Sequence, residues 1–196
     1  MNLNVEKILI IGLGMIGGSI AMASKLKGIK VVGFDAEIDS LKNAVNKEII
    51  DESIYSLEEI NSKEYIKDID LVVLAVPPKQ TLEVLNNIKE IWNTDTTITD
   101  TSSVKNHIKL ENVSNVILSH PIAGSDQSGL SAADANLFND KKNVLCNPFD
   151  CSKEHLDKVD NFWKNALQMR TSLMTVSEHD LVFAMTSHLP HLIAYA

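Results

Sequence analysis

The chain has 196 residues, of which 44% are hydrophobic and 22% are charged, a composition typical of a folded globular protein rather than a disordered one. Its formal net charge is −8, with 18 basic against 26 acidic residues. A surface of this sign repels phosphate backbones, and because no run of lysines and arginines offsets it, we expect no nucleic-acid partner.

The first part of the chain alternates between strand and helix patterns. A buried strand is predicted at Lys7–Ile11, and a helix at Met15–Lys27 that Gly28 ends. A second strand is predicted at Lys30–Phe34 and a second helix at Ile38–Lys47. Strand, helix and strand in this order indicate a unit of parallel sheet.

The apolar stretch from Ile8 to Ala23 resembles a signal peptide or a short membrane span. Four glycines interrupt it, and it is shorter than a usual span. A buried strand that leads directly into a buried helix explains it better, so we expect no membrane association.

The middle of the chain continues the alternation. A buried strand at Asp70–Val76 is ended by two prolines, a helix is predicted at Thr81–Trp92, and short strands are predicted at Thr96–Thr99 and Asn115–Leu118. This order predicts an α/β fold with a doubly wound parallel sheet of the Rossmann type, covered by helices on both faces. We assign residues 1–175 to this dinucleotide-binding domain.

The last predicted element is an apolar helix at Ser177–Ala196. Ser177 and Asp180 have the spacing of a capping-box variant, and Pro190 is expected to kink the helix. The helix ends without a cap. We therefore interpret residues 176–196 as the beginning of an all-α helical domain that is truncated here.

The two cysteines, Cys146 and Cys151, match no metal-binding or redox spacing. Two thiols in a chain of this length are typical of a reducing compartment, which predicts a cytoplasmic protein. We expect them to be reduced thiols rather than a disulfide or a nucleophile.

A glycine pattern lies between the first strand and the first helix. It is the G-x-G-x-x-G run Gly12-Leu13-Gly14-Met15-Ile16-Gly17. The first glycine permits a tight turn, the second lets the backbone approach a pyrophosphate, and the third lets helix and strand pack closely. The pyrophosphate would sit at the helix N-terminus, where the helix dipole favours negative charge. No Lys-Ser or Lys-Thr follows, which excludes a P-loop.

Asp35 follows the second strand, about twenty residues beyond the glycines. Its carboxylate can accept hydrogen bonds from the adenosine ribose and would repel a 2′-phosphate, so the sequence predicts NAD as the cofactor rather than NADP. The alternative is that Asp35 is only a turn residue. Val76 and Pro77, where the next long strand ends, are assigned to the same cofactor site.

Chemistry on such a fold comes from the loops at the carboxyl ends of later strands. A hydroxyl-rich stretch covers residues 99–105, and a second polar stretch covers residues 119–129. His120 lies where the sheet presents residues to a ligand, and a histidine there can take a proton from a hydroxyl near neutral pH. The alternatives are a helix cap for the first stretch and, for His120, a side chain that satisfies a loop carbonyl.

The C-terminal helix carries four polar side chains of interest: His179, Ser187, His188 and His191. Ser187 and His191 are four residues apart and share a helix face. We expect no metal site, because no acidic residue lies between His188 and His191 and a zinc site would need a third ligand. A substrate pocket is favoured over metal, and an ordinary core helix is the other interpretation.

Together these segments resemble the prephenate dehydrogenase family, which includes the arogenate and cyclohexadienyl dehydrogenases of tyrosine synthesis. The matching segments are, in order, G-L-G-M-I-G-G-S, D-T-S-S-V-K, S-H-P-I-A-G-S-D-x-S-G and H-D-x-x-F-A-x-T-S-H-L-P-H. Many dehydrogenases share the glycine pattern, whereas the two histidine-containing segments are more particular. The resemblance extends from about Lys7 to Ala196.

The resemblance implies an oxidative decarboxylation. NAD would take a hydride from the hydroxyl-bearing ring carbon of prephenate and carbon dioxide would leave, giving 4-hydroxyphenylpyruvate. His120 would take the hydroxyl proton as the catalytic base, and Ser103 would orient that hydroxyl beside the nicotinamide.

The substrate-binding residues that the resemblance implies are Ser103, His120, Ser125, Asp126, Ser187, His188 and His191. The helix residues of this set would line the far wall, with His179 a weaker candidate. Asp126 would influence the choice between prephenate and arogenate. The sole arginine, Arg170, does not match the carboxylate-binding arginine of the family.

The resemblance also implies a homodimer formed through the helical domain of the full-length protein. Two other functions remain open. One is an arogenate-preferring or dual-specificity dehydrogenase, and the other is a non-catalytic NAD-binding module. The presence of both Ser103 and His120 argues against the module.

Overall fold

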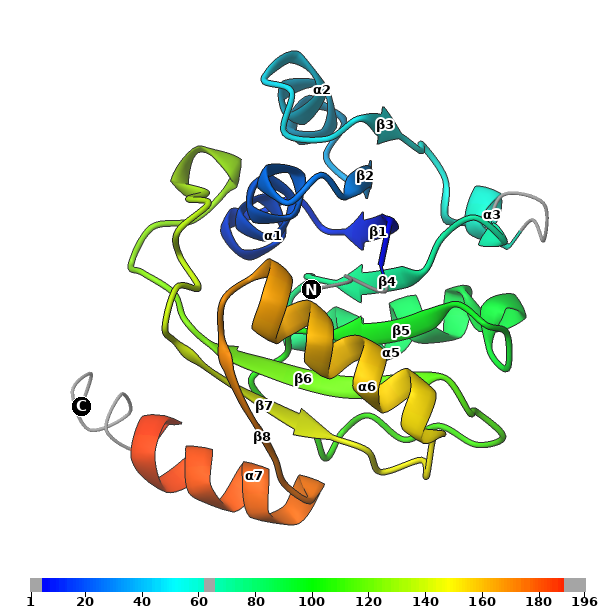
Figure 1. The fold of residues 1–196 in the computed structure, drawn as a ribbon, viewed down its shortest axis with the longest axis vertical. Coiled ribbons are helices and arrows are strands. Elements are labelled where there is room, and N and C mark those ends of the chain that lie inside the picture. The colour runs from blue at the N-terminus through cyan, green and yellow to red at the C-terminus, as the bar shows by residue number, and fades with distance from the viewer. Residues whose placement is uncertain (1–4, 62–65, 189–196) are drawn as a thin grey trace.

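The structure is a computed structural model that describes residues 5–61 and 66–188. Within this part of the chain eight strands form one sheet in the order β3-β2-β1-β4-β5-β6-β7-β8 (Figure 1). Their bounds are β1 Lys7–Ile11, β2 Lys30–Phe34, β3 Glu52–Ser53, β4 Leu71–Leu74, β5 Thr97–Asp100, β6 Val116–Ile122, β7 Lys142–Cys146 and β8 Arg170–Leu173.

Helices cover both faces of this sheet (Figure 1). They include the α-helices α1 Met15–Leu26, α2 Ile38–Asn46, α3 Leu57–Ile60, α5 Pro78–Asn87, α6 Lys153–Asn161 and α7 Val176–Phe183. Short turns occupy η1 Lys89–Ile91 and η2 Leu130–Ala132, and π-helical turns extend α6 as η3 Phe162–Ala166 and α7 as η4 Ala184–His188. None of the helices in the described residues is long and apolar enough to cross a membrane.

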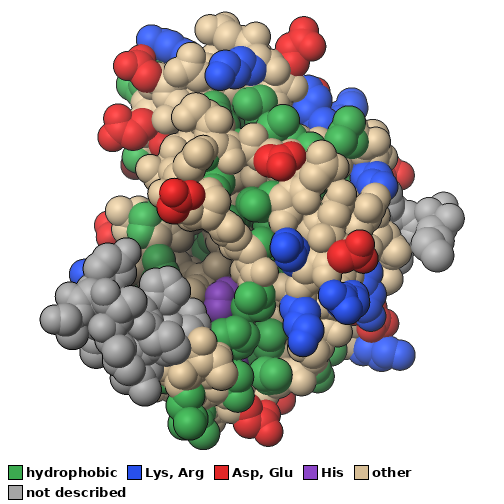
Figure 2. Space-filling view, turned by 90° about the vertical axis from the view of Figure 1, so that its left-hand side faces the viewer, with side chains coloured by type: hydrophobic (Ala, Val, Ile, Leu, Met, Phe, Trp, Pro, Cys, Tyr) green, Lys and Arg blue, Asp and Glu red, His purple; other side chains and the backbone are tan. Residues whose placement is uncertain are grey.

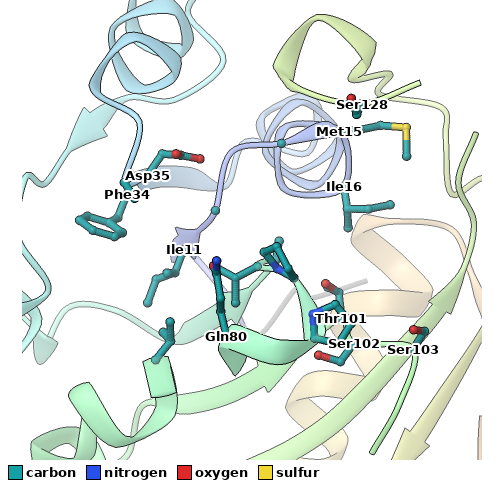
Figure 3. Close-up of a pocket in the computed structure, with 18 of the residues that line it drawn as sticks. Ile11, Met15, Ile16, Phe34, Asp35, Gln80, Thr101, Ser102, Ser103 and Ser128 are labelled. Atoms are coloured by element: carbon teal, nitrogen blue, oxygen red, sulfur yellow. The ribbon is translucent and has the colours of Figure 1, made fainter. Parts of the chain in front are cut away.

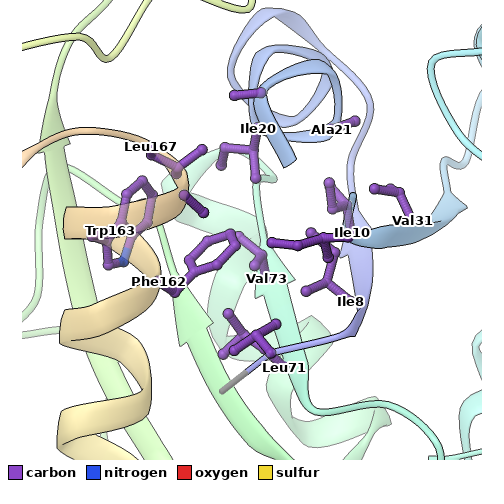
Figure 4. Packing of buried hydrophobic residues seen from close by; sticks show 14 of the residues in the cluster. Ile8, Ile10, Ile20, Ala21, Val31, Leu71, Val73, Phe162, Trp163 and Leu167 are labelled. Carbon is purple, nitrogen blue, oxygen red and sulfur yellow. The ribbon is translucent and has the colours of Figure 1, made fainter. Parts of the chain in front are cut away.

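From Ile8 to Ile11 the sequence of strand β1 is apolar without interruption because both faces of the strand are buried. Ile8 and Ile10 pack into one hydrophobic cluster, and the alternate residues Leu9 and Ile11 pack into the cluster on the opposite face. Figure 4 shows the first cluster, where Ile20 of α1 and the aromatic rings of η3 lie over β1 and β4. The predicted strand buried on both faces is confirmed, and so is the α/β class.

The sheet is mixed rather than wholly parallel. Strands β1 to β6 pair in parallel, but β6 and β7 are antiparallel, and β7 and β8 are parallel again. An antiparallel neighbour needs no crossover helix, so the long connection between β6 and β7 can lack one. The strand–helix alternation predicts only parallel pairing, and it does not predict β7, α6 or β8.

Strand β6 is longer than its predicted range of Asn115–Leu118 and contains Pro121. Pairing with β5 ends at Ile117, so the far half of β6 has only β7 as a neighbour. A proline is tolerated where one side of a strand is unpaired. His120 therefore lies within a strand, opposite Val144 of β7, and not in the loop after it.

The predicted cap of the C-terminal helix is wrong by two residues. Thr175 is the N-cap of α7, and it forms a capping box with Glu178. The Asp180 carboxylate is instead used across the fold, where it accepts hydrogen bonds from the backbone N–H groups of Lys105 and Asn106. Pro190, with its predicted kink, lies outside the described residues.

The two cysteines are free and buried. Burial raises the pKa of Cys146 to about 11, and it also raises the pKa of Cys151. A thiol that stays protonated at neutral pH is a poor nucleophile.

Candidate active site

A cleft of about 780 Å³ follows the carboxyl ends of the central strands. In the sheet, β1 lies between β2 and β4, so the strand order reverses at β1. Ligands of sheets of this kind bind at the carboxyl ends of the strands beside such a reversal. Figure 2 shows a hollow on this face with a histidine side chain at its edge. Figure 3 shows the wall, with Asp35 at one end and Ser102 and Ser103 at the other.

The three glycines of the pattern have different surroundings. Gly12 has a φ of +96°, and a Cβ there would lie 2.7 Å from the carbonyl oxygen of Ala75. A Cβ on Gly17 would collide with the carbonyl oxygen of Gly12. By contrast, a Cβ on Gly14 would meet nothing within 4 Å, and Gly14 lines the cleft. The open space beside Gly14 fits a ligand that comes against the backbone, as a pyrophosphate does.

The Asp35 carboxylate lines the cleft and is bound to backbone on two sides. The N–H of Leu13 donates to Oδ2 at 2.6 Å, and the N–H of Glu37 donates to Oδ1 at 2.8 Å. The carboxylate therefore fixes the glycine loop against the end of β2. Its oxygens retain lone pairs that can accept hydrogen bonds from a ribose.

The other predicted cofactor residues divide into two groups. Met15, Ile16, Val76 and Pro77 line the cleft. The Leu13 side chain is fully buried in the core, so only its backbone belongs to the loop. Gly17, as described, is a packing position rather than part of the wall.

The predicted Ser103 and His120 are brought together at one end of the cleft. Thr101, Ser102 and Ser103 line it from the segment after β5, and His120 lines it from β6. Ser102 is buried and shares a 2.7 Å hydrogen bond with Thr81 of α5, which holds the segment against that helix.

His120 forms a hydrogen bond with a second histidine, His179. Nδ1 of His120 lies 2.8 Å from Nε2 of His179, and the ring of Phe183 packs edge-on against His120 with 4.7 Å between centroids. This hydrogen-bond partner of the His120 ring lies on α7. The sequence ranks His179 below the other histidines of that helix, yet His179 is fully buried beside His120.

Asp180 completes this group, since its Oδ1 lies 2.7 Å from Nδ1 of His179. Burial lowers the pKa of His179 below its usual value, more than the hydrogen bond to Asp180 raises it, so the ring is neutral at pH 7. Burial pulls the pKa of Asp180 upward, but hydrogen bonds from His179 and the N–H groups of Asn106 and Lys105 hold it below its usual value.

A buried ion pair lies behind His120. Nζ of Lys105 is 2.7 Å from Oδ2 of Asp100, both side chains are fully buried, and Nζ also donates to the carbonyl oxygen of Ser119. Asp100 in turn accepts from the N–H groups of Ser102 and Ser119. The pair joins β5, the segment after it and β6, which fixes Ser103 and His120 relative to each other. In the sequence, the two residues of this pair lie five apart within the hydroxyl-rich stretch 99–105.

Of the remaining predicted substrate residues, Ser125 and Asp126 have described side chains, and neither lines the cleft. Ser125 and Asp126 lie on an exposed loop outside the lining, where Ser125 Oγ donates to Sδ of Met15 at 3.3 Å. Ser187 and His188 belong to the backbone of η4, and His191 lies outside the described residues. Among the residues the structure describes, no group of three or more histidine, cysteine or acidic side chains could hold a metal ion.

Comparison with known proteins shows similarity along nearly the whole chain. Residues 20–169 match the model of the nucleotide-binding domain of prephenate dehydrogenase. The chain is 34% identical to the prephenate dehydrogenase of Lactococcus lactis, and 32% identical to the cyclohexadienyl dehydrogenase of Zymomonas mobilis, each over 97% of its residues. It covers 52% and 65% of those two proteins, so it spans about half to two thirds of their length.

A solved structure has the same fold. All of this chain superposes on 68% of the prephenate dehydrogenase of Aquifex aeolicus in complex with hydroxyphenyl propionate and NAD+, with a TM-score of 0.87 and 30% identity.

Proposed function

This chain belongs to the prephenate dehydrogenase family, and from that premise we propose that the protein oxidises prephenate with NAD+, releasing carbon dioxide and 4-hydroxyphenylpyruvate. The observation that carries the proposal is that one cleft joins the glycine loop and Asp35 at one end to Ser103 and His120 at the other. A cofactor bound along the loop would bring its reactive ring to the histidine.

The residues that would hold NAD are those of the loop and the strand ends around it. Gly14 leaves room for the pyrophosphate, and the N-terminus of α1 favours its charge. Asp35 would accept from the adenosine ribose and disfavour a 2′-phosphate. Met15, Ile16, Val76 and Pro77 would pack against the cofactor. When bound, NAD+ supplies the hydride acceptor.

The chain's own residues would position the substrate and move one proton. His120 would take the proton of the ring hydroxyl as that carbon is oxidised, and Ser103 would orient the hydroxyl toward it. Loss of the ring carboxylate as carbon dioxide leaves its electron pair on the ring, which becomes a phenolate. The proton on His120 then returns to that oxygen, so no net proton is released.

The other parts of the proposal concern the rest of the site. Ser125, Asp126, Ser187, His188 and His191 would contribute to substrate binding. We assign residues 1–175 to the nucleotide-binding domain and 176–196 to the start of a helical domain through which the whole protein forms a homodimer. A cytoplasmic location fits a biosynthetic dehydrogenase.

Arogenate is a second candidate substrate, because one of the similar proteins is a cyclohexadienyl dehydrogenase. The test is to follow NADH absorbance with prephenate and with arogenate, using the intact protein, and to measure NAD+ binding in parallel. NADH formed with prephenate at the higher kcat/KM supports the proposal. A higher kcat/KM with arogenate would make arogenate the substrate. NAD+ binding without turnover of either compound would favour the non-catalytic binding module over the enzyme.

A further inference from the structure

The candidate base is the end of a chain of three side chains. Asp180 Oδ1 lies 2.7 Å from His179 Nδ1, and His179 Nε2 lies 2.8 Å from His120 Nδ1. His179 is fully buried, and Phe183 packs against both histidine rings with 4.7 Å between centroids. These three hydrogen-bonded side chains, Asp180, His179 and His120, link the helix α7 to the strand β6.

The direction of donation in these hydrogen bonds follows from Asp180. Asp180 accepts from the backbone N–H groups of Lys105 and Asn106, which leaves an ionised carboxylate that can only accept from His179. His179 is neutral, so it carries its hydrogen on Nδ1 and its lone pair on Nε2. That lone pair must be met by a donor, so the hydrogen of His120 lies on Nδ1.

We propose that His179 and Asp180 are positioning residues that hold His120 in the tautomer with its hydrogen on Nδ1 and its lone pair on Nε2. A neutral histidine can act as a base only through the nitrogen that carries the lone pair. The tautomer follows from the hydrogen bonds and from the burial of His179, while its use in catalysis rests on the proposed function.

The same arrangement supports His120 after it has taken a proton. The imidazolium keeps its Nδ1–H toward His179, and the negative charge of Asp180 lies one ring away. The proton stays on His120, because passing it on would charge the fully buried His179. The charged groups around His179 are Asp180, Lys105 and Asp100, and the last two neutralise each other in their ion pair.

The chain is also tied to Ser103. The two N–H groups that hold Asp180 belong to Lys105 and Asn106, two and three residues after Ser103 in sequence. The segment that carries Ser103 into the cleft therefore also anchors Asp180, and through His179 it is linked to His120 on β6.

Ring nitrogen NMR tests the proposal directly. The intact protein, labelled with ¹⁵N-histidine and free of substrate, is observed at a pH where His120 is neutral. We expect the Nδ1 resonance of His120 to be that of a protonated nitrogen and the Nε2 resonance that of an unprotonated one. The opposite assignment overturns the proposal.

Two substitutions of one residue supply the matched pair. His179→Leu removes the acceptor from His120, whereas His179→Gln places an amide oxygen near the position of Nε2. We expect the leucine variant to lose the Nδ1–H tautomer and about tenfold in kcat with little change in KM, and the glutamine variant to recover both. Amide spectra establish that each variant is folded.

A His120 tautomer that is unchanged in His179→Leu also overturns the proposal. The expected tautomers without NADH formation on prephenate or arogenate leave the positioning inference intact and overturn the proposed function instead.

Discussion

The backbone N–H of Leu13 donates to Oδ2 of Asp35 at 2.6 Å, so the carboxylate at the end of β2 holds the glycine loop that follows β1. The two residues are 22 apart in the chain and meet because β1 and β2 are parallel neighbours. One side chain thus shapes the loop and faces the space that the cofactor ribose would occupy.

We expect Asp35→Asn to weaken NAD+ binding by about tenfold or more, because a charge-assisted hydrogen bond contributes about 1.5–3 kcal/mol. It should also narrow the preference for NAD+ over NADP+, since the charge that repels the 2′-phosphate is gone. Titration calorimetry measures both affinities. Glu37→Gln removes an exposed charge two residues away and should leave them unchanged; equal losses in both variants would contradict the role of Asp35.

Gly14 and Gly17 should respond differently to alanine. A Cβ on Gly17 meets the backbone of Gly12, so Gly17→Ala should lower the free energy of unfolding by roughly 1–3 kcal/mol. A Cβ on Gly14 meets nothing, so Gly14→Ala should stay as stable as the parent and lose NAD+ affinity. Urea unfolding and cofactor titration of the two variants separate the effects. A stable Gly14→Ala variant that binds NAD+ normally would contradict the placement of the pyrophosphate beside Gly14.

His120→Asn should reduce kcat by about 10²- to 10⁴-fold, the range that general base catalysis contributes. NAD+ affinity should change little, because Asp35 and the glycine loop are untouched. Steady-state rates and cofactor titration give the two quantities. His155→Asn, which removes a histidine bonded to Thr97, serves as the control and should retain turnover. Full activity in His120→Asn would exclude it as the base.

Lys105→Met should lower the free energy of unfolding by about 3–5 kcal/mol, because it leaves the fully buried Asp100 carboxylate without its counter-charge. Adding Asp100→Asn removes that charge and should recover part of the loss. Denaturant unfolding of the two single variants and the double variant gives the coupling energy. Strictly additive losses would show that the pair contributes nothing as a pair.

The free energy of unfolding should decrease as the pH falls below about 6.5, and His179 should account for part of that decrease. Burial lowers the pKa of this ring from the usual value of 6.5, so in that window the unfolded chain binds more protons than the folded one. Stability is therefore complete above pH 6.5 and is lost as pH falls through the folded pKa. The Asp180 contribution has the same sign but belongs below pH 3.8.

Thermal unfolding of the parent and of His179→Gln between pH 7.5 and 5 measures this effect. The variant should lose less stability than the parent over this range. His155, whose pKa is also lowered by burial and by the charge of Lys158, contributes equally in both proteins and cancels in the comparison. Parallel curves for the two proteins would contradict the prediction.

The sequence alone determined the α/β class and the glycine loop after β1, with Asp35 at the end of β2. These features are local: they depend on strand and helix periods and on backbone conformations that few residues other than glycine can adopt. They could be predicted because no distant partner is needed to recognise them.

Only the tertiary structure shows which histidine contacts His120. His179 lies 59 residues along the chain from its partner, and nothing in its helix distinguishes it from His188 until α7 is placed beside β6. The antiparallel β7 and the buried pair of Lys105 and Asp100 depend in the same way on contacts between segments far apart in sequence. Burial and hydrogen-bond polarity arise only when those segments meet, because both are properties of a neighbour and not of the residue itself.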